Sequence, residues 1–255
     1  MRARALAVTA VLLIGPGDRR RPPVPVPSDA TPACTGVRFE GTRITICPVD
    51  TRRDRVTLTV AGPDGQPLRS LSALRATLGT GARDVRFAMN AGMYGQDRWP
   101  IGLYVENGRT RHPLNLTPGE GNFHLLPNGV FAVNPQGRMA VIESNRFGHS
   151  RARLLFATQS GPLLVTGGKL HPRLSDNGAS ELLRNGVGVQ DAHHAVFAIS
   201  DDPVSFGRFT RLFRDRLHCP DALFLDGSVS SLWDPGAGRL DGYGRLGPMV
   251  VVYRR

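Results

Sequence analysis

Residues 222–234 read ALFLDGSVSSLWD, and this stretch decides how the rest of the chain is interpreted. Its apolar start, Ala222–Leu225, is too short for a helix and predicts a buried strand. Asp226 follows at the C-terminal tip of that strand, and Gly227 lets the backbone turn or approach a ligand there. Three serines add short hydroxyls beside the acid: Ser228, Ser230 and Ser231. The stretch therefore predicts a carboxylate presented at the end of a core strand.

The segment before this stretch extends the same pattern. Ala195–Ser200 predicts a strand, and apolar residues at helical spacing from Phe206 to Leu217 predict an amphipathic helix before the strand at 222–225. Strand, helix and strand within about thirty residues indicate a crossover between parallel strands. Asp201 would then share one sheet edge with Asp226, the edge where open sheets bind ligands. Asp202 competes with Asp201 as the second carboxylate.

The composition favours a β-rich fold. The 255 residues include 30 glycines and 20 prolines, which indicates many turns. Between Phe123 and Ser144, short apolar runs alternate with turn signals such as PNG and NPQG, which predicts a β-meander. We expect an α/β or α+β fold, built as a curved mixed β-sheet with helices packed on part of one face.

The charge is strongly positive but carries no nucleic-acid signature. The formal net charge is +11, and Lys169 is the only lysine, so arginine supplies nearly all of it. The arginines are scattered along the sequence, with no basic helix and no patch interleaved with aromatic residues. We therefore expect no nucleic-acid partner and retain only a general attraction to anionic ligands.

The N-terminus has the character of an export signal. Arg2 and Arg4 precede the apolar run Ala5–Ile14, which is too short to span a bilayer as a mature helix. We divide the chain into a signal peptide or anchor at 1–15, a disordered Pro/Arg-rich linker at 16–33 and one domain at 34–255. The protein is expected in the periplasm, outside the cell or in the cell envelope, with membrane contact only through an uncleaved N-terminal segment.

The chain has three cysteines, and an exported protein can form disulfides between them. Cys34 and Cys47 flank two alternating strands around a Gly41-Thr42 turn, so we expect them to form a disulfide across that hairpin. Cys219 would remain as a buried thiol before a core strand. The absence of C-x-x-C disfavours a zinc or redox site through cysteine. The sequence requires no cofactor and leaves a divalent metal open.

Polar clusters also follow other strands. Asn90 and Tyr94 come after a short buried strand and suit a sugar hydroxyl and a sugar ring face. Arg184 stands beside two glycines, where a guanidinium and the backbone could together hold an oxyanion. The residues expected to contact substrate are Asn90, Tyr94, Ser160, Gly161, Asn185, Gly188, Gly227, Ser228, Ser230 and Ser231. Each cluster taken singly is also explained by turn chemistry.

Taken in this order, these motifs resemble those of a known protein family. MNAGMY, PIGLYVENG, ATQSGPLLVTGGKL, RNGVGV and ALFLDGSVSSLWD together resemble the phosphodiester glycosidase domain family of the uncovering-enzyme type, in its exported bacterial branch. The likeness spans residues 38–253. It implies functional roles for the asparagine at Asn90, the arginine at Arg184 and the aspartate at Asp226. Ser228 and Asn185 depart from the family pattern, so the resemblance does not assign a particular sugar.

The resemblance implies hydrolysis of a glycosyl-1-phosphodiester to a free sugar and a phosphomonoester. A phosphomonoester has a second pKa of about 6 and leaves readily, so a strong general acid is less necessary than in other glycosidases. We expect Asp226 as the catalytic carboxylate, Arg184 as the phosphate clamp and Asp201 as a second carboxylate. The substrate would be a small sugar phosphodiester or a phosphate-containing glycopolymer. The alternatives are a non-catalytic envelope protein that binds anionic glycopolymer, and a metal-dependent phosphodiesterase.

Overall fold

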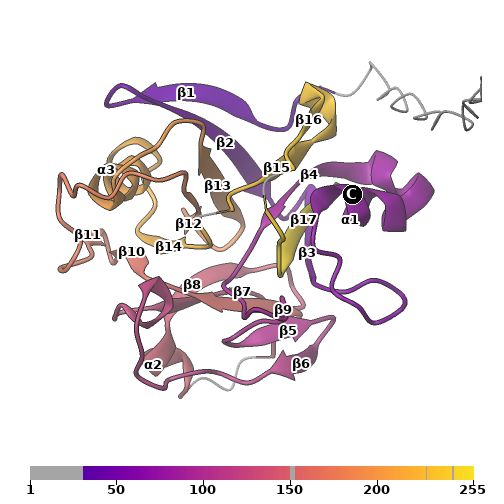
Figure 1. Ribbon diagram of the computed structural model, residues 1–255, viewed down its shortest axis with the longest axis horizontal. Coiled ribbons are helices and arrows are strands. Elements are labelled where there is room, and N and C mark those ends of the chain that lie inside the picture. The colour runs from indigo at the N-terminus through magenta and orange to yellow at the C-terminus, as the bar shows by residue number, and fades with distance from the viewer. Residues whose placement is uncertain (1–30, 150–152, 228, 243) are drawn as a thin grey trace, which may run out of the picture.

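Three antiparallel β-sheets form the body of the protein (Figure 1). The computed structural model describes residues 31–149, 153–227, 229–242 and 244–255. The expected signal or anchor at 1–15, nearly all of the expected linker at 16–33, and Ser228 therefore lie outside the described residues. Within the described residues, no helix has the length and apolar character that crossing a membrane requires.

Sheet I has seven strands and carries the edge that the sequence singled out. In spatial order its strands are β1 (Thr35–Phe39), β2 (Thr42–Asp50), β13 (His194–Ser200), β12 (Asn185–Val189), β14 (Asp221–Phe224), β10 (Leu163–Thr166) and β11 (Lys169–Leu170). Its central strands are apolar on both faces, as expected for a sheet covered on both sides.

Sheets II and III have five strands each. Sheet II has the order β16 (Arg239–Leu240), β15 (Leu232–Asp234), β4 (Val85–Asn90), β17 (Met249–Arg254) and β3 (Asp54–Thr59). Sheet III has the order β6 (Arg109–His112), β5 (Tyr104–Glu106), β9 (Phe156–Ser160), β7 (Gly129–Val133) and β8 (Met139–Glu143).

Short helices and helical turns connect these strands. They are α1 (Leu71–Leu78), α2 (Ser144–Phe147), α3 (Phe206–Arg211), a π turn directly after α3 (Leu212–Arg216), and 3₁₀ turns at Gly79–Asp84, Asn122–His124 and Pro235–Ala237. The Ser70 hydroxyl accepts from Ala73 N and caps α1, and Gly79 ends it.

Phe197 marks the point where the three sheets meet. Its ring, on β13 of sheet I, packs edge-to-face against Phe87 of sheet II at 5.7 Å and Phe131 of sheet III at 5.6 Å between centroids. The opposite face of sheet I packs against α3 and the π turn, where Phe209 and Phe213 are fully buried. Sheet I is therefore the central layer.

The expected mixed sheet is wrong in one respect, because every strand pair of the described residues is antiparallel. β13 and β14 do point the same way, but the antiparallel strand β12 lies between them. The sequence pattern identified the shared direction and could not show the inserted strand, which comes earlier in the chain. The fold is a β-rich α+β fold, and the strand ends still meet at one edge.

The disulfide prediction is confirmed. Cys34 and Cys47 are bonded with an S–S distance of 2.04 Å and lie one register step beyond the pair Thr35–Ile46 of the β1–β2 hairpin. Cys219 is a buried free thiol, and burial raises its pKa to about 12. The Asp234 carboxylate accepts hydrogen bonds from Cys34 N and Ala33 N, which ties the start of the domain to sheet II.

Candidate functional site

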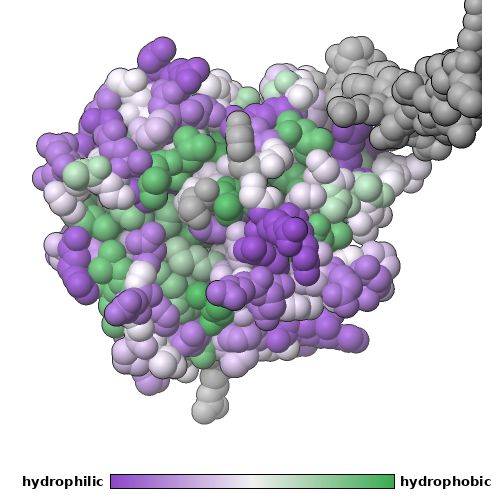
Figure 2. Space-filling model, in the orientation of Figure 1, coloured by the Kyte–Doolittle hydropathy of each residue, from purple (hydrophilic) through white to green (hydrophobic). Residues whose placement is uncertain are grey.

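The candidate site lies at one edge of sheet I, where β12 begins and β13 and β14 end. Ser200 N donates to Arg184 O at 2.8 Å, and Leu225 N donates to Asn185 O at 3.1 Å. These bonds place the segments of Arg184, Asp201 and Asp226 at the same edge although they are far apart in sequence. Seen from the side of Figure 2, hydrophilic residues cover most of the surface, and apolar residues gather in a recessed area near its centre.

Two fully buried asparagines join sheet I to sheet II at this edge. Asn185 Nδ2 donates to Asn90 O at 2.8 Å and to Asn90 Oδ1 at 3.1 Å. Asn90 Nδ2 donates to Asp226 O at 2.8 Å, and Asn185 Oδ1 accepts from Asp226 N at 3.1 Å. Ser231 N donates to Asn90 Oδ1 at 2.9 Å. The asparagine pair therefore holds both ends of the 226–231 loop.

Two serine hydroxyls bond to the backbone of the same loop, and a glycine within it packs closely against its surroundings. Ser160 Oγ donates to Leu225 O at 2.8 Å, and Ser230 Oγ lies 3.0 Å from Gly227 O. A Cβ at Gly227 would lie 2.6 Å from Phe224 Cζ, so a larger residue there would push the loop out of place. These side chains are buried and bond to backbone, and their contacts favour positioning of the Asp226 loop over direct contact with substrate.

Two further glycines of the expected substrate set lie in tight packing. A Cβ at Gly188 would meet Cys219 Sγ at 2.5 Å and Phe213 at 2.6 Å, on the α3 side of sheet I. A Cβ at Gly161 would meet Asn128 Cβ at 2.8 Å. Packing alone accounts for a glycine at both positions.

Asp226 itself is half-buried and has an aromatic neighbour. The Tyr94 hydroxyl donates to Arg245 O at 2.8 Å. Burial and, next in size, the neighbouring Asp226 carboxylate raise the pKa of Tyr94 well above its usual value, so the phenol stays protonated at neutral pH. The loop after β4 and the loop after β14 thus place a phenol beside a carboxylate.

Arg98 joins this pair and was missed in the sequence. Its guanidinium carbon lies 5.5 Å from the centroid of the Tyr94 ring, and its positive charge opposes the rise in the pKa of Tyr94. The backbone of Arg98 has φ +76°, a conformation that L residues adopt at a cost. Nothing in the sequence distinguishes Arg98 from the other arginines, because its place depends on the bridge between Tyr94 and Pro100.

Arg184 occupies a different environment. Its side chain is 1% exposed, with Nε donating to Val204 O at 2.8 Å and Nη2 to Ser180 O at 2.9 Å. The guanidinium carbon stacks 3.6 Å from the centroid of the Phe206 ring. Burial lowers the pKa of Arg184 to about 10, which leaves it charged at neutral pH. These contacts favour a role in fixing the edge of sheet I over the expected phosphate clamp.

Asp201 is also engaged by protein groups. Its carboxylate accepts from Arg239 Nη1 at 2.7 Å and from Thr45 Oγ1 at 2.8 Å, and Arg239 also binds Asp241. Asp202 forms an ion pair with Arg43 at 2.6 Å. Both carboxylates neutralise an arginine, which favours a structural role for Asp201 over that of a second catalytic acid.

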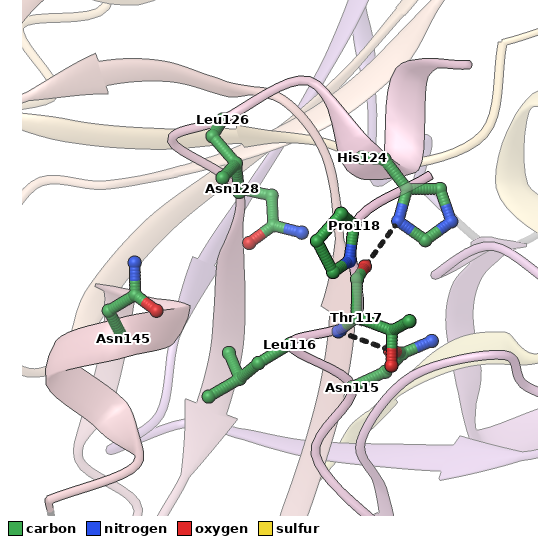
Figure 3. A pocket seen from close by; sticks show the side chains of 8 residues that line it. All are labelled: Asn115, Leu116, Thr117, Pro118, His124, Leu126, Asn128 and Asn145. Carbon is green, nitrogen blue, oxygen red and sulfur yellow. Dashed lines mark hydrogen bonds between the residues drawn. The ribbon is translucent and has the colours of Figure 1, made fainter. Parts of the chain in front are cut away.

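A small polar pocket lies next to the Gly161 turn (Figure 3). Asn128 and Asn145 both point into it, and the side chain of Leu116 forms another wall. Asn128 Nδ2 donates to Phe123 O at 2.7 Å, while its Oδ1 is buried with no partner in the described part of the chain. Asn128 therefore lines this pocket and keeps one buried acceptor without a partner in the described residues.

The described residues contain no group of three or more His, Cys, Asp or Glu side chains placed to hold a metal ion. Asp226, Tyr94 and Arg98 are partly exposed, and these groups can act on a ligand through charge and hydrogen bonds.

Comparison with known proteins assigns the chain to a family. The model of the phosphodiester glycosidase family matches residues 83–238, a range that includes Asn90, Arg98 and Asp226. The chain belongs to the phosphodiester glycosidase family. The Escherichia coli (strain K12) protein YigE, which is uncharacterized, is 36% identical over 188 residues, covering 74% of this chain and 73% of that protein.

Two solved structures share the fold of this phosphodiester glycosidase family member. The catalytic domain of zebrafish N-acetylglucosamine-1-phosphodiester alpha-N-acetylglucosaminidase, auto-inhibited by its pro-peptide, superposes with a TM-score of 0.60 at 14% identity, covering 87% of this chain and 81% of that one. A hypothetical protein from Synechocystis superposes with a TM-score of 0.56 at 14% identity, covering 87% and 61%. At these identities the likeness concerns the fold alone.

Proposed function

We propose that this protein hydrolyses a glycosyl-1-phosphodiester, releasing a free sugar and a phosphomonoester. Membership of the phosphodiester glycosidase family supports the reaction type. The observation that carries the proposal for this chain is the placement of Asp226, held by Asn90 and Asn185 at the junction of two sheets and facing Tyr94. Because the two buried amides hold the backbone carbonyl and backbone N–H of Asp226, the main chain that carries the carboxylate cannot drift with the loop, and this favours the preorganisation that electrostatic catalysis requires.

In this proposal Asp226 acts at the anomeric carbon. As the bond to the phosphate oxygen breaks, positive charge develops on the sugar ring, and a fixed carboxylate stabilises or captures it or activates a water molecule. The developing phosphomonoester takes the bonding electrons, so no strong acid is needed on the leaving side. The protonated Tyr94 hydroxyl can donate one hydrogen bond to a substrate oxygen in exchange for its bond to Arg245 O.

We propose Arg98 as the residue that holds the phosphate. Among the arginines discussed for this site, Arg98 has a guanidinium beside the Tyr94–Asp226 pair, whereas that of Arg184 is bonded to two carbonyls inside the protein. A guanidinium binds two phosphate oxygens at once, and lysine cannot reproduce that geometry. Arg184 and Asp201 are proposed as positioning residues that keep the edge of sheet I in place.

Hydrolysis of a chromogenic sugar-1-phosphodiester in oxygen-18 water tests the reaction. Cleavage of the bond between the anomeric carbon and oxygen places the label in the sugar, whereas a metal-dependent phosphodiesterase would place it in the phosphate. No turnover across a panel of sugar-1-phosphodiesters, together with tight binding of one of them, would instead identify a glycopolymer-binding protein. Label in the sugar at a rate abolished by Asp226→Asn is the expected result.

The role of Arg98 has its own test. Arg98→Lys keeps the charge and should raise KM for the phosphodiester by about tenfold, because the paired hydrogen bonds are lost. Arg55→Lys is the matched control, since Arg55 stacks on the Tyr253 ring at 4.2 Å elsewhere on the surface. Equal KM values for the two variants would remove Arg98 from the site.

A further inference from the structure

Arginines that are scattered in the sequence meet at one end of the molecule. Arg52 and Arg53 lie in the turn between β2 and β3, and both are exposed. β17 runs antiparallel to β3, so that Arg254 stands opposite Asp54. Arg255 N donates to Arg53 O at 3.0 Å. Arg254, at the end of β17, and Arg255 after it therefore add two exposed arginines to the two of the turn.

The β7–β8 hairpin adds a fifth arginine. A Cβ at Gly137 would lie 3.5 Å from Thr51 Cβ and 3.8 Å from Arg255 Nη2, so the tip of this hairpin contacts the β2–β3 turn. Arg138 follows Gly137 and is exposed. We call the surface formed by Arg52, Arg53, Arg138, Arg254 and Arg255 the arginine end.

The arginine end has few acidic partners. Some other arginines pair closely with acids, as Arg43 does with Asp202 at 2.6 Å and Arg211 with Glu40 at 2.6 Å. Within the described part of the chain, the five arginines of this surface have a single ion pair, Arg53 with Asp50 at 3.9 Å.

The nearby acids are also engaged with other side chains. Asp54 is buried and pairs with Arg86, and the exposed Asp191 pairs with His194 at 2.7 Å. A shallow hollow lined by Asp50, Arg53, Asp54, Arg86, His194 and Arg254 opens at this end. The surface is thus cationic and partly concave.

We propose that the arginine end binds the phosphate groups of a linear, phosphate-bearing glycopolymer. Exposed guanidiniums from three chain segments suit a repeating anion better than a single phosphate, and each can bind phosphate oxygens through its planar fork. Attraction of several unpaired cations to a polyanion adds up through release of counterions.

This surface is separate from the Asp226 site. β13 runs from His194 beside the arginine end to Ser200 at the candidate site, and its seven residues span roughly 20 Å at about 3.3 Å each. Polymer binding at the arginine end therefore does not depend on the proposed hydrolysis. If both hold, an extended polymer bound at this end raises the local concentration of its own linkages near Asp226.

Binding of long-chain inorganic polyphosphate to the full chain tests the proposal. The test variant replaces four arginines of the surface by glutamine: Arg52, Arg53, Arg138 and Arg254. The matched control replaces four exposed arginines outside it: Arg109, Arg111, Arg173 and Arg216. We expect Kd to rise about tenfold or more in the test variant and less than about threefold in the control, with a reduced salt slope in the test variant only.

Two results would overturn the proposal. An equal loss of affinity in both variants would mean that only the net charge matters. Binding to vesicles of phosphatidylglycerol and phosphatidylcholine that exceeds binding to polyphosphate, and that is lost in the test variant, would assign the surface to a membrane instead. Unchanged turnover of a small chromogenic phosphodiester in both variants, with unchanged thermal unfolding, establishes that the remaining protein is intact.

Discussion

The two ends of β13 use polar groups in opposite ways. At the Ser200 end, amides and hydroxyls are buried and bonded to one another or to backbone, as in the pair Asn90 and Asn185. At the His194 end, the arginines of the arginine end are exposed and have almost no acidic partners. One end fixes atoms in place, and the other presents charge to solvent.

This difference predicts different sensitivities. When a buried polar group loses its partner, the free energy of unfolding falls, because nothing replaces the lost hydrogen bond. An exposed charge contributes little to stability, is screened by salt and acts on distant ligands. Substitutions at the Ser200 end should therefore change folding and catalysis, and substitutions at the arginine end should change binding of polyanions alone.

The largest effect is expected at Asp226. Asp226→Asn is nearly isosteric and should leave KM close to normal, because the carboxylate acts on charge that develops only in the transition state. Loss of that electrostatic contribution is worth about 3 kcal/mol, so kcat should fall at least about a hundredfold. Steady-state kinetics decide this, and a variant with near-normal kcat would show that Asp226 is a structural turn residue.

The next largest effect is expected at the asparagine pair. Asn90→Ala removes the bonds to Asp226 O and Ser231 N and leaves buried groups unpaired, so the free energy of unfolding should drop by about 2–4 kcal/mol. Asn134→Ala is the control, since Asn134 Oδ1 accepts from backbone in an exposed hairpin turn. Urea unfolding of both variants gives the comparison, and similar losses would contradict the role of the buried junction.

Asp201→Asn should have a smaller effect. It weakens the pair with Arg239, whose side chain is 27% exposed against 24% for Asp201, so a loss of about 1 kcal/mol is expected. Its kcat should fall far less than that of Asp226→Asn, because Asp201 is proposed to position the edge of sheet I and not to act on substrate. A hundredfold fall in kcat without loss of stability would restore Asp201 as a catalytic carboxylate.

The smallest effect concerns the carboxylates of Asp191 and Asp202, one near each end of β13. The Arg43 side chain lowers the pKa of Asp202 to about 2, whereas the pKa of Asp191 is lowered to about 2 first by the His193 backbone N–H. Both pKa values are depressed, so each carboxylate contributes stability above its usual pKa near 3.8 that is lost as the pH falls towards 2. NMR titration in about 1 M salt should raise the pKa of Asp202 more than that of Asp191, because salt screens ion pairs. Equal shifts would contradict this assignment of causes.

Local patterns in the sequence were sufficient for several strands and for the edge. Ala222–Leu225 predicted β14, and alternation around Gly41 predicted the hairpin that the Cys34–Cys47 disulfide closes. They were not sufficient for sheet order, because β12 enters between β13 and β14 from an earlier part of the chain. Hydrophobic periodicity reports which face of a strand is buried and does not report its neighbours.

Among the candidate residues, the sequence by itself determined that Asp226 ends a core strand and that polar side chains follow several others. Only the tertiary structure decided which of those side chains face Asp226, because facing depends on contacts between segments distant in the chain. It buried Arg184 between carbonyls and Phe206, brought Arg98 to Tyr94, and gathered the arginines of the arginine end. A guanidinium has the same chemistry at every position, so its role is set by the partners that folding brings to it.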